Sequence, residues 1–189
     1  MKGRYEIRLS GSGGQGLVTA GIILAEAVGL HPDRFVCQSQ SYGPEARGGA
    51  SKSEVIVSHE EIDYPKAVKP DVLLAMNQSA CDTYLFDLKP GGTVIVDATL
   101  VKQMPTTRAA AIPFTRIART EIGREGVANI VALGALTAIT KIVPLKSLEE
   151  AVLARVPAGT EEMNREALQA GIKAARKWMR ASRSQTSPT

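Results

Sequence analysis

Residues 5–28 read YEIRLS-GSGGQG-LVTAGIILAEAV and join three different patterns. Polar and apolar residues alternate from Tyr5 to Ser10, which predicts a strand with Ile7 and Leu9 on one face. The apolar stretch from Leu17 to Val28 has the length and composition of a helix. Residues 11–16 match G-x-G-x-x-G between the two. The chain therefore opens with a Rossmann-like strand, glycine loop and helix.

The remaining sequence continues this alternation of strands and helices. Further strands are predicted at residues 34–39, 52–58, 62–64, 72–76, 93–98 and 110–114. Helices are predicted at residues 78–88, 116–123, 129–141, 147–155 and 160–181, with Ser147 and Thr160 as the starts of the last two. The pattern predicts a three-layer α/β/α domain with a largely parallel, mixed sheet, in which the turn at His59 indicates one antiparallel strand. We expect one domain over residues 1–181 and a disordered tail over residues 182–189.

Composition excludes several classes of protein. The chain has 189 residues, of which 44% are hydrophobic and 22% charged, as in ordinary globular domains. Its longest weakly polar stretch, Val127 to Ile139, is shorter than the roughly 20 residues of a membrane-spanning helix. The N-terminus does not resemble a signal peptide. We therefore expect a cytoplasmic protein that does not contact a membrane.

The charge distribution argues against a nucleic-acid partner. Residues 167–189 contain five basic and no acidic residues, which leaves 18 basic against 19 acidic residues in the first 166. The net charge of +4 is thus a property of the tail, and only 4% of residues are aromatic. A base-stacking surface of the kind that single-strand binders use is therefore not expected.

Histidine and cysteine give no catalytic or metal constellation. Cys37 and Cys81 are far apart in the sequence, so neither a disulfide framework nor a zinc or iron–sulfur ligand set is predicted. His31 and His59 lie in separate turns without a nearby Ser, Cys or carboxylate pattern. We assign no catalytic residue and no metal site to this chain.

The glycine loop predicts a site for a phosphate-bearing ligand. Glycines permit close backbone approach, and the start of the following helix presents unpaired N–H groups to an anion. A dinucleotide needs an acidic residue at the end of the second strand, where this chain has Ser39-Gln40-Ser41. A nucleoside triphosphatase needs Lys and Ser or Thr after the last glycine, where this chain has Leu17-Val18. A tight turn without a ligand is the alternative.

A second polar loop, Ser41 to Ser51, follows the second predicted strand. Arg47 precedes two glycines, a combination suited to phosphate or carboxylate recognition. An exposed Glu45–Arg47 pair without function is the competing interpretation. Asn77-Gln78-Ser79 and Asn129 stand at predicted helix starts, where we interpret the asparagines and the serine as helix caps.

Six segments together resemble a known family. They are GSGGQG (11–16), SYGPEARGGASKSEV (41–55), PDVLLAMNQ (70–78), GGTVIVDATLV (91–101), PFTRIA (113–118) and NIVALGAL (129–136). In this order they resemble the gamma subunit of 2-oxoacid:ferredoxin oxidoreductases, with most likeness to the 2-oxoglutarate type. The resemblance extends from about Tyr5 to Lys173. Aryl-pyruvate and branched-chain enzymes have similar gamma chains, so the 2-oxoacid stays open.

The resemblance implies a non-catalytic subunit of a larger enzyme. That enzyme converts a 2-oxoacid, coenzyme A and oxidised ferredoxin into an acyl-CoA, carbon dioxide and reduced ferredoxin. Thiamine diphosphate and iron–sulfur clusters would sit on alpha and beta partner subunits, with a delta subunit in some assemblies, and ferredoxin would be met through the complex. The chain alone would be inactive.

The resemblance also assigns residues to sites. The gamma domain would close over the active site and help to receive coenzyme A. The anion-binding turn would consist of Gly11, Ser12, Gly13, Gly14, Gln15 and Gly16, and the loop that faces the thiamine-bearing subunits would contain Tyr42, Arg47, Gly48 and Gly49. Two alternatives remain: a free-standing dinucleotide-binding oxidoreductase, and a purely structural subunit whose glycine loop holds nothing.

Overall fold

The computed structural model describes residues 3–41, 50–104, 106 and 108–185. Within these residues, one sheet of six strands has the order β2-β3-β1-β4-β5-β6. The strands are β1 (Tyr5–Ser12), β2 (Phe35–Ser41), β3 (Ala50–Ser58), β4 (Val72–Ala75), β5 (Thr93–Asp97) and β6 (Ala110–Ile112). Strands β1, β4, β5 and β6 are parallel, whereas β3 runs antiparallel to both β1 and β2. The largely parallel, mixed sheet is confirmed.

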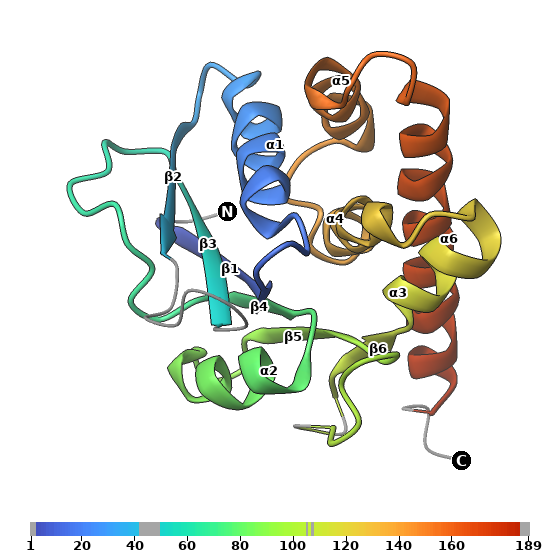
Figure 1. Cartoon of the computed structure of the whole chain (residues 1–189). Coiled ribbons are helices and arrows are strands. Elements are labelled where there is room, and N and C mark those ends of the chain that lie inside the picture. The colour runs from blue at the N-terminus through green and yellow to red at the C-terminus, as the bar shows by residue number, and fades with distance from the viewer. Residues whose placement is uncertain (1–2, 42–49, 105, 107, 186–189) are drawn as a thin grey trace.

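Helices cover both faces of the sheet. They are α1 (Leu17–Gly29), α2 (Gln78–Tyr84), η1 (Leu85–Asp87), α3 (Phe114–Ile117), η2 (Ala118–Ile122), η3 (Glu125–Val127), α4 (Ala128–Thr140), α5 (Leu145–Arg155) and α6 (Glu161–Gln185). Helix α1 and the orange and red helices α4 to α6 lie on one side of the sheet, and the green α2 lies on the other (Figure 1). The predicted three layers are confirmed.

The two central parallel strands are buried on both faces. In β4, Leu74 joins the main core with α1 and α4, whereas Ala75 joins the smaller cluster beneath α2. In β5, Ile95 and Val96 divide in the same way. This double burial explains why both strands are continuous apolar runs rather than alternating ones.

The expected strand at residues 62–64 is absent, which corrects the prediction of a hairpin at His59. Among the described strands the one antiparallel strand is β3, which pairs with β1 and β2. Residues 62–64 have no strand structure, and the backbone oxygens of Tyr64 and Lys66 accept hydrogen bonds from the Arg4 guanidinium, at 2.8 and 2.7 Å. The Arg4 side chain, and not a neighbouring strand, is thus the hydrogen-bond partner of these two backbone oxygens.

Several helix boundaries also differ from the prediction. The helix expected over 78–88 is α2 followed by the short η1. Helix α5 begins at Leu145, directly after Pro144, so Ser147 lies inside the helix and does not cap it. Pro suits the start of a helix because it pre-sets the backbone and needs no N–H partner.

Two further boundaries lie nearer the C-terminus. The helical stretch expected from Arg116 begins earlier, at Phe114, because the N–H and hydroxyl of Thr115 both donate to the buried Asp97 carboxylate at the end of β5. Helix α6 extends to Gln185, so residues 182–185 continue the helix instead of forming part of the expected tail. Residues 186–189 lie outside the described part of the chain.

The topology places the glycine loop at a switch point of the sheet. After β1 the chain crosses through α1 to β2 on one side, whereas after β4 it crosses through α2 to β5 on the other. Strands β1 and β4 are adjacent and parallel, and the chain leaves their carboxyl ends towards opposite faces. In open α/β sheets this is where ligands bind.

Candidate functional site

The glycine turn spans the four residues between β1 and α1. Gly14 and Gly16 have left-handed backbone angles, with φ of 88° and 71°. The Gln15 N–H donates to the Ser12 backbone oxygen at 3.3 Å and closes the turn. Among the described residues no side chain caps α1, and the first turn of this helix contains no acidic residue. Within that part of the chain, the first N–H groups of α1 thus lack the side-chain partners that occupy most helix starts.

The glycines have different structural reasons to lack a side chain. A Cβ atom at Gly11 would lie 2.3 Å from the Gln15 Oε1, and one at Gly16 would lie 2.5 Å from the Asn129 Nδ2. Gly14 needs its left-handed angle. Gly13 has no positive φ, and a Cβ atom there would have no described atom within 4 Å. Packing among the described residues therefore does not explain the absence of a side chain at Gly13.

The polar side chains of the turn are directed inward. Gln15 Oε1 accepts the Ser12 N–H at 2.7 Å, and Gln15 Nε2 donates to the Met76 oxygen at 3.4 Å. The Asn77 amide donates to the Ser12 hydroxyl, while Asn77 Oδ1 caps α2 by accepting the Ala80 N–H at 2.8 Å. The side chains of Ser12 and Gln15 hold β1 to β4, so the open part of the turn is the backbone of Gly13 and Gly14.

Asn129 supports the same turn from a distant part of the sequence. Its Nδ2 donates to the Gly16 oxygen at 3.0 Å, and its Oδ1 accepts the Ile130 N–H at 2.9 Å. The expected role as a cap was wrong, because α4 begins one residue earlier, at Ala128, without a side-chain cap from the described residues. The buried amide instead joins the start of α4 to the start of α1.

The second predicted loop is attached at the same edge of the sheet. Tyr42, Arg47, Gly48 and Gly49 lie outside the described residues. On the far side of the loop, Ala50 pairs with Ser12 in the β1–β3 register. The chain thus leaves the loop directly beside the glycine turn, as the sequence predicted for the loop's position; the contacts of its residues stay a prediction.

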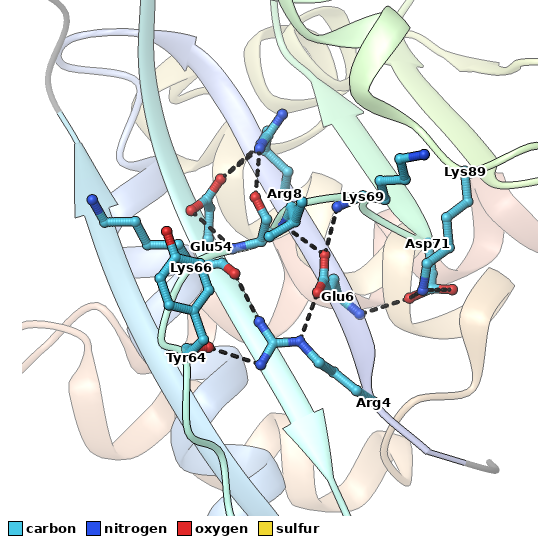
Figure 2. A network of polar contacts seen from close by, with 11 residues as sticks. Arg4, Glu6, Arg8, Glu54, Tyr64, Lys66, Lys69, Asp71 and Lys89 are labelled. Atoms are coloured by element: carbon cyan, nitrogen blue, oxygen red, sulfur yellow. Dashed lines mark hydrogen bonds and ion pairs between the residues drawn. The ribbon is translucent and has the colours of Figure 1, made fainter.

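A buried ionic network at the other end of β1 was missed by the sequence analysis. Arg8 is 2% exposed and Glu54 3% exposed, and the Arg8 guanidinium meets the Glu54 Oε1 at 2.8 Å (Figure 2). Arg8 also donates to the Ala67 oxygen at 3.0 Å and pairs with Asp87. The guanidinium lies 5.1 Å from the centre of the Tyr84 ring. This one side chain connects β3, the 59–71 segment, α2 and η1.

Glu6 and its neighbours complete the network. Glu6 Oε2 accepts the N–H groups of Val68 and Lys69 at 2.8 and 2.9 Å, and its Oε1 binds Arg4 (Figure 2). Asp71 accepts the Glu6 N–H and the Lys89 ammonium, both at 2.8 Å. The alternation of Arg4, Glu6 and Arg8 with apolar residues was the available signal, since it placed three charges on one face of a central strand.

Neither metal chemistry nor a dinucleotide site is supported by the described residues. No group of three His, Cys, Asp or Glu among them could hold a metal ion. Burial raises the pKa of the Cys81 thiol, with a smaller contribution from the Asp82 charge.

Strand β3 separates β2 from β1, so the residues at the end of β2 are not beside the glycine turn as a dinucleotide fold requires. None of the described helices has the length and apolarity to cross a membrane.

These observations define a doubly wound α/β domain with an open glycine turn at its switch point. The chain belongs to the pyruvate ferredoxin/flavodoxin oxidoreductase family, whose sequence profile matches residues 6–174. The family resemblance seen in the sequence is thereby confirmed. The chain is 53% identical over 180 residues to the 2-oxoglutarate synthase subunit KorC of Methanocaldococcus jannaschii, covering 93% of this chain and 96% of that protein.

Solved structures show the same fold. The gamma subunit of a keto/oxoacid ferredoxin oxidoreductase from Geobacter sulfurreducens is 49% identical with a TM-score of 0.84, over 93% of this chain and 98% of that one. A 2-oxoglutarate:ferredoxin oxidoreductase from Magnetococcus marinus is 25% identical with a TM-score of 0.81. This chain is covered to 94% by that match but accounts for only 32% of the other chain.

Proposed function

We propose that this chain is the gamma subunit of a 2-oxoglutarate:ferredoxin oxidoreductase. The complex would oxidatively decarboxylate 2-oxoglutarate to an acyl-CoA while reducing ferredoxin. Identity supports this substrate: 2-oxoglutarate synthase subunits from Methanocaldococcus jannaschii and Methanothermobacter marburgensis are 53% and 49% identical. A common gamma subunit of pyruvate/ketoisovalerate oxidoreductases from Thermococcus litoralis is only 34% identical. A cytoplasmic location is part of the proposal.

The contribution of this chain would be to receive coenzyme A at the glycine turn. The observation that carries this is the open backbone at Gly13, where packing among the described residues does not require glycine. Coenzyme A bears phosphate groups, and the start of α1 offers N–H donors and the positive end of a helix dipole. The structure from Magnetococcus marinus, which contains a domain of this fold, was solved with coenzyme A and succinyl-CoA bound.

Positive charge would come from the neighbouring loop. By the family resemblance, Arg47, with Tyr42, Gly48 and Gly49, would face the thiamine-bearing subunits. Ala50, which follows that loop, pairs with Ser12 of the turn. Thiamine diphosphate and the iron–sulfur clusters would belong to alpha and beta subunits, with delta in some assemblies. The whole sequence has only two cysteines, too few for the four ligands of an iron–sulfur cluster, which supports placing the clusters on other subunits. The chain itself would position coenzyme A and exclude water without performing a chemical step.

The test is a bulky substitution at Gly13 in the assembled enzyme. Gly13→Val places a side chain in the path of the ligand without a clash against the described residues. We expect the KM for coenzyme A to rise about tenfold, a loss of about 1.4 kcal/mol of binding, while the KM for 2-oxoglutarate is unchanged. The complex would be recovered through a tagged chain under anaerobic conditions and assayed by 2-oxoacid-dependent dye reduction.

A matched control lies at the other end of α1. Gly29 also has an ordinary φ, and a Cβ there would meet only the Val36 Cγ1 among the described atoms, at 3.9 Å. Gly29→Val should therefore leave both KM values unchanged. If Gly13→Val assembles normally and keeps the wild-type KM for coenzyme A, the turn is structural and the proposal for it fails. A complex that prefers pyruvate or indolepyruvate would overturn the substrate while leaving the family intact.

A further inference from the structure

A cationic cavity lies at the far end of α1 from the glycine turn. Its volume is about 510 Å³, and it lies between the turn that follows α1, the end of α4 and the C-terminal half of α6. Its described lining contains three cations, Arg34, Lys141 and Arg176, and no carboxylate. Most of the remaining lining is apolar, including Ile142, Leu145 and Met179. A cavity with this lining is suited to an anion that carries an apolar body.

Two of the three described residues with an unpartnered buried polar atom line this cavity. Three described residues have a buried side-chain nitrogen or oxygen without a hydrogen-bond partner, namely His31 Nε2, Arg34 Nε and Thr137 Oγ1. Arg34 and Thr137 line the cavity, and His31 begins the turn that carries Arg34. Thr137 is only 1% exposed. Because buried polar groups are nearly always paired, their concentration here indicates a missing partner.

The arginine in the cavity wall is already oriented. The Arg34 Nη1 donates to the Ile142 backbone oxygen, which fixes the plane of the guanidinium against the segment that follows α4. Arg34 has no ion pair with any described residue. A fixed guanidinium with donors to spare is the group that recognises carboxylate and phosphate most often in proteins.

Lys141, which also lines the cavity, has an unusual backbone conformation. Its φ of 55° makes it the one non-glycine residue of the described chain with a left-handed backbone. It ends α4 by donating its N–H to the Thr137 oxygen at 2.8 Å, a position that glycine normally occupies. The strained lysine puts an ammonium group at the cavity where glycine would fold more easily.

We propose that this cavity binds an organic anion, with one carboxylate or phosphate group on an apolar body. The anionic group would lie among Arg34, Lys141 and Arg176, and the apolar body would pack on Ile142 and Met179. Helix α1 has 13 residues, so at 1.5 Å per residue the cavity and the glycine turn are separated by about 20 Å. The inference rests on this geometry alone and does not depend on the proposed role in coenzyme A binding.

The test uses the full chain, with hexanoate as probe and calorimetry at constant ionic strength. Wild-type protein should bind hexanoate saturably and should not bind 1-hexanol, which lacks the charge. Arg176→Gln and Lys141→Gly should each weaken binding about tenfold, as expected for the loss of one charge-assisted contact. Without ligand, Lys141→Gly should unfold at a higher temperature than wild type, because glycine relieves the left-handed strain.

Arg180→Gln is the matched control, since Arg180 lies one helical turn beyond Arg176 and does not line the cavity. It should bind hexanoate like the wild type. Inorganic phosphate is titrated in parallel, and saturable phosphate binding lost in the same two variants would support the site with a phosphate ligand. Equal weakening in all three variants, equal binding of 1-hexanol, or no saturable binding of either anion would overturn the proposal.

Discussion

The two halves of β1 differ in how far side chains fill the space around them. At the amino-terminal end, Arg8 is buried but its charge is paired, with Glu54 at 2.8 Å and the Ala67 oxygen at 3.0 Å. At the carboxyl end, the backbone of Gly13 has no described atom near the position that a Cβ would take. One end is closed by side chains and the other is kept clear of them.

This difference helps to distinguish charged groups that stabilise the fold from backbone groups that are free to bind a ligand. The ionic network resembles an active site by residue type, yet its groups are saturated by one another and by backbone N–H and C=O groups of residues 64–69 (Figure 2). The glycine turn contains no charge, but it leaves donors uncommitted among the described residues. We therefore expect a ligand at the glycine turn, where hydrogen bonds are unmet, and not at the ionic network, where they are satisfied.

The largest expected effect comes from removing Arg8. Arg8→Ala removes the guanidinium from the buried Glu54, which keeps only Lys52 at 3.2 Å and the Ala67 N–H at 3.3 Å as partners. The free energy of unfolding should therefore fall by about 3 kcal/mol in urea titrations, the lower end of the range for breaking a buried ion pair. Arg119 forms an exposed ion pair with Glu125 at 2.7 Å, and Arg119→Ala should cost less than about 1 kcal/mol. A similar small loss in both variants would mean that the network contributes no more than a surface pair.

A medium effect is expected within the glycine turn itself. Gly16→Ala forces a side chain into a left-handed backbone and against Asn129, so we expect a loss of about 1–3 kcal/mol. Gly13→Ala should stay within about 0.5 kcal/mol of wild type. Equilibrium unfolding of the two variants measures the contrast directly. Equal destabilisation would show that Gly13 is also required by the fold.

The smallest effect concerns the pH dependence of stability. Burial and, to a lesser extent, the nearby Asp71 carboxylate raise the pKa of Tyr5 above its ordinary value of 10.0. The folded chain therefore holds this proton more tightly than the unfolded chain, and the associated stability is complete below pH 10 and is lost as pH rises through the folded-state pKa. The urea midpoint of Tyr5→Phe should therefore decline less steeply than that of the wild type between about pH 8 and about pH 11. An unchanged slope would contradict the assignment.

The fold was largely predictable because its main signals are local. The apolar runs of β4 and β5 and the glycines before α1 act through backbone conformation and burial, which short stretches encode. Two of the errors occurred where a distant side chain takes part in the local structure. Arg4 donates to the backbone oxygens of Tyr64 and Lys66, and Asp97 accepts the N–H of Thr115 in the first turn of α3; neither partner is near in sequence.

The sequence predicted where the glycine turn lies but not which of its residues are needed for packing and which are exposed. The motif located the turn, yet Ser12 and Gln15 bind Asn77 and Met76 inside the fold. Which glycines are needed for packing depends on Asn129, more than a hundred residues away from Gly16. Such roles depend on tertiary contacts, which a single sequence does not reveal.

The central position of β1 has a consequence for biosynthesis. Strand β1 pairs with β3 and β4, which both follow it in the chain, and its turn is completed by Asn129 of α4. During synthesis β1 must therefore wait for residues 50–75 before its strand hydrogen bonds can form, and an unpaired central strand invites association with other chains. The Asn129 contact forms only once residue 129 has been made, so the glycine turn is completed later than the strand that leads into it.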